Sequence, residues 1–191
     1  MQTRRWNKRH LSTLGIGLLL FYMIFSASRN TYKSDIIIPN TKSELVWEYV
    51  ADFHKMHQLN PTILNFIVTK EEGHFNHWKY SIEYTERLSH WPYWINVAEA
   101  DFVVKKLLQD ERGQYSVTSD HRTCFLGGLY CLYSTGEFLF VTRGSDTYVV
   151  ETVNYQCPPF FGPVCRREVE FQRKAIMQNL SVHFNKLNKN L

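Results

Sequence analysis

Apolar residues follow three different patterns along this chain. Residues 14–25 form an uncharged apolar run that follows a basic stretch. Between residues 63 and 155 apolar and polar residues alternate in several segments, and a period of two indicates strands with one buried face. From residue 163 onward apolar residues recur at helical spacing, which is typical of a helix with one apolar stripe.

This pattern predicts an α+β domain with one sheet. A short strand is expected at 36–38, and a helix of about ten residues follows it near 43–53. Six further strands in meander order precede the long helix, whose stripe must be buried against the sheet. The six strand candidates are 63–68, 78–85, 96–108, 114–120, 133–142 and 147–155.

Charge and composition exclude one class of partner. The net charge is +4, and Arg4, Arg5, Lys8 and Arg9 supply four positive charges ahead of the apolar run. The rest of the chain is close to neutral, which argues against nucleic-acid binding. Aromatic residues make up 15% of the chain. Such side chains fill cores, but they also line ligand cavities.

The N-terminal segment predicts entry into the secretory pathway. A basic stretch, an apolar run and the small residues Ser26 and Ser28 have the layout of a secretory signal. The run is shorter than the roughly 20 residues that span a bilayer comfortably, so two outcomes stay open. Residues 1–28 are either a signal anchor, giving a single-pass membrane protein with a lumenal or extracellular domain, or a signal peptide cleaved near Ser28. Residues 29–34 are expected to be a linker and residues 35–191 the ligand-binding domain.

The four cysteines predict disulfide bonds, which suit an oxidising compartment. None lies in a Cys-x-x-Cys or Cys/His metal-binding pattern. A Gly-Gly hairpin signal at 127–128 puts Cys124 opposite Cys131, at a separation that a disulfide accepts. Cys157 and Cys165 could then clamp the loop between them. Pairs between the two loops compete with these local pairs.

The opening segment of the domain resembles a known family. The order strand, two helices, six antiparallel strands and long helix is that of the START-like, or helix-grip, superfamily, which includes polyketide cyclase/dehydrase-like and coenzyme-Q-binding proteins. Residues 36–53 have the sequence IIIPNTKSELVWEYVADF and are followed by Leu59, Asn60 and Pro61. This segment resembles the family's first strand, the start of its first helix and its Asp-Phe turn. The resemblance implies a curved antiparallel sheet of about seven strands wrapped around the C-terminal helix, behind an N-terminal hydrophobic helix. Family members include lipid carriers, quinone binders and enzymes, so the fold by itself assigns no activity.

In this fold the space between sheet and helix is either filled or left as a cavity. We predict a ligand cavity, because bulky rings leave gaps against a helix and tyrosine hydroxyls could orient a polar head group. A filled core is the alternative. The candidate cavity residues are Trp78, Tyr80, Ile82, Tyr84, Phe102, Val104, Ile176 and Leu180.

Three apolar loops are expected at one end of the meander, because its strands alternate in direction. They predict a hydrophobic rim that serves as a ligand portal or dips into a membrane. Loops that pack on one another and plug this end are the alternative. The candidate rim residues are Trp91, Tyr93, Trp94, Phe125, Leu126, Leu129, Tyr130, Phe160 and Phe161.

Catalytic and metal-binding motifs are missing from the sequence. The histidines form no helix pair with an acidic third ligand, and no nucleophile or dinucleotide motif occurs, so no metal, cofactor or catalytic residue is predicted. Glu83, Glu99, Asp101 and Glu137 lie on strands where one of them could point inward, although solvent-facing positions are expected. The glycosylation acceptor Asn179 lies in the final helix beside the buried stripe, which disfavours its modification.

These features together predict a protein that binds an apolar ligand. It would bind, and in addition transfer, a lipid, isoprenoid or sterol-like molecule held between the sheet and the C-terminal helix. The alternatives are a cyclase-like or other small-molecule enzyme on the same fold, and a protein-interaction module with a filled core. The expected partners are a hydrophobic small molecule and a membrane, contacted through the N-terminal segment and the aromatic loops.

Overall fold

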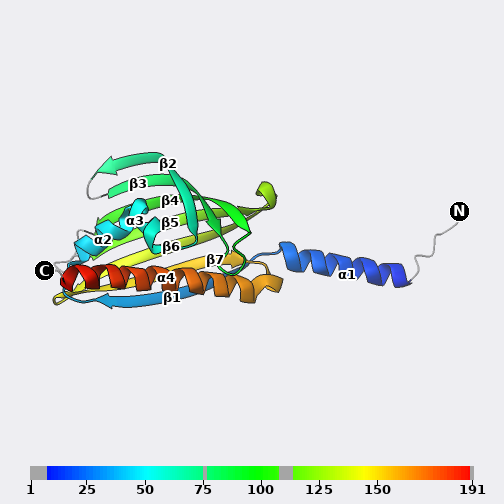
Figure 1. The fold of residues 1–191 in the computed structure, drawn as a ribbon. Helices are drawn as coiled ribbons and strands as arrows, with labels where there is room; N and C mark the ends of the chain where they lie inside the picture. Colours follow the sequence, from blue (N-terminus) through cyan, green and yellow to red (C-terminus); the bar gives the residue numbers. More distant parts are fainter. Residues whose placement is uncertain (1–7, 75–76, 108–113, 190–191) are drawn as a thin grey trace.

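The computed structural model describes residues 8–74, 77–107 and 114–189 (Figure 1). Its helices and strands follow the predicted order, including the N-terminal helix, and two short 3-10 turns, η1 and η2, lie near the cysteines. The elements are α1 (Lys8–Phe25), β1 (Ser28–Ile38), α2 (Ser43–Ala51), α3 (Phe53–Leu59), β2 (Ile63–His74), β3 (His77–Arg87), β4 (Ile95–Leu107), β5 (Gln114–Phe125), η1 (Leu126–Gly128), β6 (Tyr130–Arg143), β7 (Asp146–Cys157), η2 (Pro159–Phe161) and α4 (Gly162–Lys189).

All seven strands form one antiparallel sheet in the order β1-β7-β6-β5-β4-β3-β2. Each strand from β2 to β6 pairs with the next one along the chain, and β1 completes the sheet as an edge strand by pairing with β7. The sheet bends around α4, which runs along its concave face (Figure 1). The predicted helix-grip fold is therefore confirmed, including the meander of six strands from β2 to β7.

The predicted linker at 29–34 is instead the first part of β1. This strand pairs with β7 from Ser28, opposite Cys157, to Ile38, opposite Thr147. Its polar residues resembled a spacer because β1 is an edge strand with one face in solvent, where polar side chains are expected. Only alternate residues, beginning with Tyr32, are partly covered.

The prediction of a membrane anchor is wrong. None of the described helices is long and apolar enough to cross a bilayer. The N-terminal helix α1 has 18 residues, and its first turn holds Lys8, Arg9 and His10, so its apolar part is short. The assignments of a signal anchor, a single-pass membrane protein and a membrane partner bound through this segment are withdrawn. The basic residues Arg4 and Arg5 lie outside the described residues.

Large side chains fill one half of the space between sheet and α4, where α2 and α3 close the end. Trp47 of α2 is fully buried, with ring centroids 5.2 Å from Trp78 and 4.7 Å from Tyr115. Its indole Nε1 donates a hydrogen bond to the Ser116 carbonyl at 3.2 Å. The C-terminal part of α4 covers these rings. We call this region the filled half, and its other core residues include Phe102, Phe138, Phe140, Ile176 and Leu180.

Candidate ligand-binding site

A cavity of about 610 Å³ occupies the other half, between the sheet and the N-terminal part of α4. This volume lies within the range of small-molecule sites. Apolar and aromatic side chains make up most of its wall, and a few polar groups interrupt them. The polar residues that matter below are Tyr84 and Glu86 of β3, Asn96 of β4, His121 of β5, and Glu168, Gln172 and Arg173 of α4.

The cavity exists because the inward positions of β4, β5 and β6 carry short side chains at this end. Ala98 of β4 lies opposite Thr123 of β5, and Gly136 of β6 lies opposite Ser119. In the filled half the same strands place Phe102, Phe138 and Phe140 on this face. Because short side chains replace rings here, the side chains of α4 border the space between helix and sheet without filling it.

Only one of the eight candidate cavity residues, Tyr84, lines this cavity. The others, from Trp78 to Leu180, belong to the filled half or pack against it. Tyr80 stacks on Phe102 with ring centroids 4.8 Å apart, and its hydroxyl donates to the Ala51 carbonyl at 2.9 Å. The two rings pack against each other, and the tyrosine hydroxyl is satisfied by α2. Trp78 and Tyr80 border a separate hollow of about 340 Å³ beside α2 and α3.

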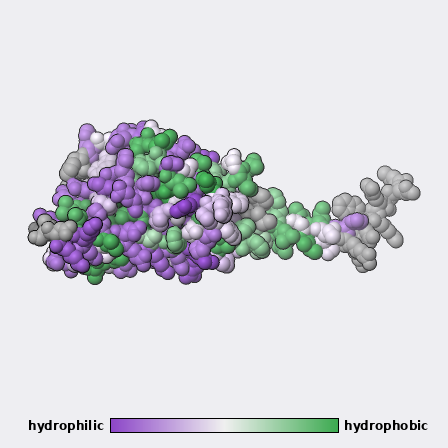
Figure 2. Space-filling view, viewed as in Figure 1, coloured by the Kyte–Doolittle hydropathy of each residue, from purple (hydrophilic) through white to green (hydrophobic). Residues whose placement is uncertain are grey.

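The rim residues lie at the cavity end of the domain, where the β3–β4 loop, η1 and η2 come together. Six of them line the cavity, namely Trp91, Trp94, Phe125, Leu126, Tyr130 and Phe161. The other three are exposed, with Tyr93 98%, Leu129 85% and Phe160 65% accessible. Hydrophobic surface extends over this end of the molecule and onto α1 (Figure 2). The loops therefore surround the cavity without burying their own apolar side chains.

Two disulfide bonds stiffen this end. Cys124 pairs with Cys131 across the β5–β6 hairpin, in the register that places the two residues opposite each other. Cys157 at the end of β7 pairs with Cys165 in the first turn of α4. Both are the local pairs considered from the sequence. The second bond ties the start of α4 to the sheet and thereby fixes one wall of the cavity.

A buried ion pair lies beside the cavity. Arg173 of α4 donates to the carboxylate of Glu151 at 2.6 Å. Glu151 is fully buried, and burial raises its pKa although the charge of Arg173 lowers it. The guanidinium also lines the cavity wall. The pair positions the middle of α4 over β7.

Glu86 and Asn96 form a second polar pair on the wall. They lie directly opposite each other in the β3–β4 ladder, and both face the cavity. Burial raises the pKa of Glu86 to about 7, with the charge of Glu168 adding to the rise and that of Arg173 opposing it. Asn96 is 1% exposed, and within the described part of the chain neither polar atom of its amide has a hydrogen-bond partner.

His121 is held as a neutral imidazole between two hydroxyl groups. Its Nδ1 lies 3.0 Å from the Tyr84 hydroxyl, and its Nε2 lies 2.9 Å from the Ser119 hydroxyl. Burial, together with the smaller effect of the nearby charge of Arg173, lowers the pKa of His121 to about 3. The ring therefore contributes hydrogen-bonding groups to the cavity without a charge at neutral pH.

We expect His121→Gln to flatten the acid side of the stability profile. An unfolded imidazole titrates near 6.5, so as the pH falls below that value protons bind the unfolded chain and not the folded one. The wild type should lose up to about 2 kcal/mol more than the variant between pH 7.5 and pH 5.0. Urea unfolding of both proteins at the two pH values measures this difference. Parallel losses in the two proteins would contradict it.

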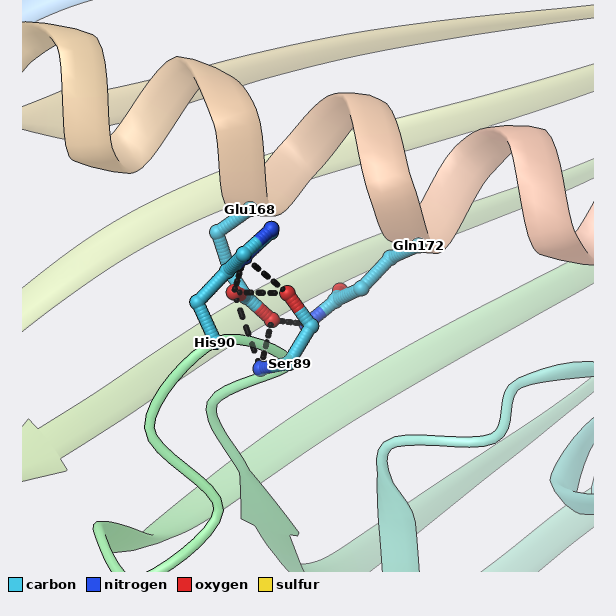
Figure 3. Close-up of polar contacts among 4 residues, drawn as sticks. All are labelled: Ser89, His90, Glu168 and Gln172. Atoms are coloured by element: carbon cyan, nitrogen blue, oxygen red, sulfur yellow. Dashed lines mark hydrogen bonds and ion pairs between the residues drawn. The ribbon is translucent and has the colours of Figure 1, made fainter.

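A carboxylate of α4 clamps the β3–β4 loop over the cavity (Figure 3). The Ser89 amide donates to both oxygens of Glu168, at 2.9 and 3.0 Å, and the Ser89 hydroxyl donates at 2.7 Å. Gln172 donates to the same carboxylate at 3.2 Å, and His90 Nδ1 lies 3.8 Å from it. Because Leu88, Trp91 and Trp94 of this loop line the cavity, the clamp holds part of the wall in place.

Removing this clamp should loosen the loop. In Glu168→Ala we expect faster hydrogen exchange at the Ser89 amide and across residues 88–94, since the loop loses its anchor on α4. Hydrogen-exchange mass spectrometry measures the change. Glu170→Ala is the matched control, because Glu170 pairs only with Arg166 and Lys174 along the helix surface among the described residues. Equal exchange in the two variants would show that Glu168 does not hold the loop.

The sequence analysis did not predict the polar groups of the cavity, although the alternation of apolar and polar residues along β3 could have identified one of them. Glu83 and Glu99, considered as inward carboxylates, are exposed, as are Asp101 and Glu137. Glu86 is the acid in phase with Tyr80, Ile82 and Tyr84, so it continues their inward face. Asn179 donates to the Leu59 carbonyl at 2.8 Å through the same amide nitrogen that a glycan would occupy.

Comparisons with known proteins identify the fold. No family model matches the sequence, and a search of curated proteins finds no significant relative. A START superfamily protein from Mycobacterium smegmatis superimposes with a TM-score of 0.53 at 15% identity, over 82% of this chain and 98% of the other. Norcoclaurine synthase from Thalictrum flavum gives 0.51 at 12% identity, over 87% and 90%. The protein TTHA0849 from Thermus thermophilus gives 0.55 at 13%, over 83% and 99%. The chain thus has a START-like fold, and identities this low establish the fold alone.

Proposed function

We propose that this protein binds a hydrophobic small molecule in the cavity beneath the N-terminal part of α4. The observation that carries the proposal is the cavity itself, about 610 Å³ with a mainly apolar wall. An interior that is hollow at this end also argues against an interaction module with a filled core. The START-like fold is consistent with such a site, since its sheet and helix can enclose a ligand.

The rim residues give the ligand a path into the cavity. Trp91 and Trp94 line it from the loop, while Tyr93, Leu129 and Phe160 project into solvent. A ligand that moves from water into the cavity gains roughly 25 cal/mol for each Å² of apolar surface buried. The apolar rim would provide part of this favourable free energy already while the ligand enters the cavity. The two disulfide bonds keep this end rigid and are compatible with an extracellular location.

Fluorescence and mass spectrometry test this proposal. The neutral probe N-phenyl-1-naphthylamine should bind saturably to one site per chain, brighten, and quench tryptophan emission from Trp91 and Trp94. Native mass spectrometry of the protein purified from an oxidising secretory host should detect a bound apolar molecule. No saturable probe binding together with no retained ligand would overturn the proposal.

Catalysis in the same cavity is a second candidate function. The observation in its favour is that Glu86, whose pKa is raised to about 7, and the neutral His121 both face the cavity. A carboxyl group with a pKa near 7 can donate or accept a proton at neutral pH, and the neutral imidazole can hydrogen-bond a substrate beside it. Incubating a metabolite extract with the wild type and with Glu86→Gln, followed by untargeted mass spectrometry, distinguishes the two functions. Products formed by the wild type alone favour catalysis, and identical profiles favour binding.

A further inference from the structure

We propose that the ligand of this cavity is an amphiphile whose polar end is a protonated amine, bound between Glu86 and Asn96. The inference rests on the proposed function and adds the chemistry of the head group. Two independent features of the wall point to it: the balance of charge around the cavity, and an amide without partners.

The charges that line the cavity are mainly negative. Glu86 and Glu168 both face it, whereas Arg173 is the single cationic side chain in the described part of the wall. Arg173 is already neutralised by Glu151 at 2.6 Å. Neither remaining carboxyl group forms an ion pair with a lysine or arginine among the described residues, and Arg173, whose charge also acts on Glu86, is one cation beside three carboxyl groups. An anionic head group would therefore meet repulsion, and a cationic head group would supply the missing charge.

The amide of Asn96 supplies the second feature. Both of its polar atoms lack hydrogen-bond partners among the described residues, although the side chain is 99% buried against the cavity wall. A buried polar group left unpaired costs folding free energy, and a ligand that bonds to it recovers that cost. Because Asn96 lies opposite Glu86 in the ladder, its carbonyl and the carboxylate can accept from the same ammonium group.

The neighbours of Glu86 make this site sensitive to pH. The groups that face it are Arg173, Glu168 and Gln172 of α4, Tyr84 of β3 and Asn96 of β4. Protonation of Glu86 as the pH falls below about 7 removes its charge and weakens attraction for an ammonium group. Between pH 8 and pH 5.5 alkyl amines remain protonated and alkyl carboxylates remain ionised. A change in the preference for amine over carboxylate therefore comes from titration of the protein.

Competition between matched ligands tests the proposal. Decylamine, decanol and decanoate share one chain length, and each would displace N-phenyl-1-naphthylamine. The amine and the carboxylate are kept below their critical micelle concentrations, and the alcohol below its solubility limit in water. At pH 8 we expect decylamine to displace the probe at a concentration at least ten-fold lower than decanoate, with decanol between them. At pH 5.5 the ratio should fall to three-fold or less.

Variants assign the preference to the two residues. Glu86→Gln and Asn96→Leu should each reduce the ratio of decylamine to decanoate affinity at pH 8 by five-fold or more, with probe binding retained as the check on folding. Glu83→Gln removes a carboxylate from the exposed face of the same strand and should leave the ratio unchanged. Equal affinity for the amine and the carboxylate, or a ratio unaffected by Glu86→Gln, would overturn the inference while probe binding leaves the proposed function intact. Failure of all four molecules to bind would overturn the proposed function itself.

Discussion

Ser134→Phe should weaken binding of N-phenyl-1-naphthylamine at least ten-fold, equivalent to about 1.4 kcal/mol. Ser134 lies on the inward face of β6, opposite His121, and lines the cavity. A phenyl ring there would occupy space that the ligand needs. Since the cavity already provides the room, the variant should fold, and fluorescence titration then measures the loss of binding directly.

Thr135→Phe is the matched control for this experiment. Thr135 is the next residue on β6, and its side chain is exposed on the opposite face of the sheet. The control adds the same ring to the same strand without entering the cavity, so probe binding should match the wild type. Unchanged binding in a folded Ser134→Phe variant would show that the probe does not occupy the cavity.

Arg173→Met should destabilise the protein by about 3–5 kcal/mol at neutral pH. The substitution leaves Glu151, which is fully buried, without its counter-ion. A buried carboxylate that loses its partner must either remain charged in a poorly solvated place or take up a proton. Chemical denaturation with the wild type as reference measures the loss of unfolding free energy.

A double variant separates the lost ion pair from lost packing. Glu151→Gln combined with Arg173→Met removes both charges, and we expect it to recover more than half of the stability lost by Arg173→Met alone. Arg166→Met serves as the surface control. Its ion pair with Glu170 is largely exposed, so the cost should stay within about 0.5 kcal/mol. A double variant as unstable as the single one would show that the arginine stabilises α4 by packing alone.

The fold could be predicted from the sequence because local patterns determine it. Alternation of apolar and polar residues identified the strands of the sheet, and the helical spacing after residue 163 identified α4. The glycine pair at 127–128 gave the register of the β5–β6 hairpin, which the structure confirms with Cys124 opposite Cys131. Each of these signals depends on neighbours along the chain. The start of β1 escaped because an edge strand needs little apolar content.

The position of the cavity could not be predicted in the same way. Alternation along a strand shows which residues face inward. It does not show whether large side chains from other elements fill the space next to them. Trp78 and Tyr80 were expected to line the ligand cavity, yet Trp47 and Phe102 pack beside them, and the hollow that they border is a smaller, separate one of about 340 Å³. The hollow half depends on short residues such as Ala98 and Gly136 on different strands, and only the folded sheet brings them together.

Separation of the interior into a filled half and a hollow half has a consequence for how this protein can diverge. Completely buried rings such as Trp47 and Phe140 stabilise the fold and do not line the ligand cavity. The short residues that border the open space of the cavity, such as Thr123 and Ser134, contribute less to stability, so they can be exchanged at smaller risk of unfolding. During evolution, single substitutions at cavity positions such as Thr123 and Ser134 could therefore change which ligand binds. Residues around Trp47 should vary less, because they stabilise the fold.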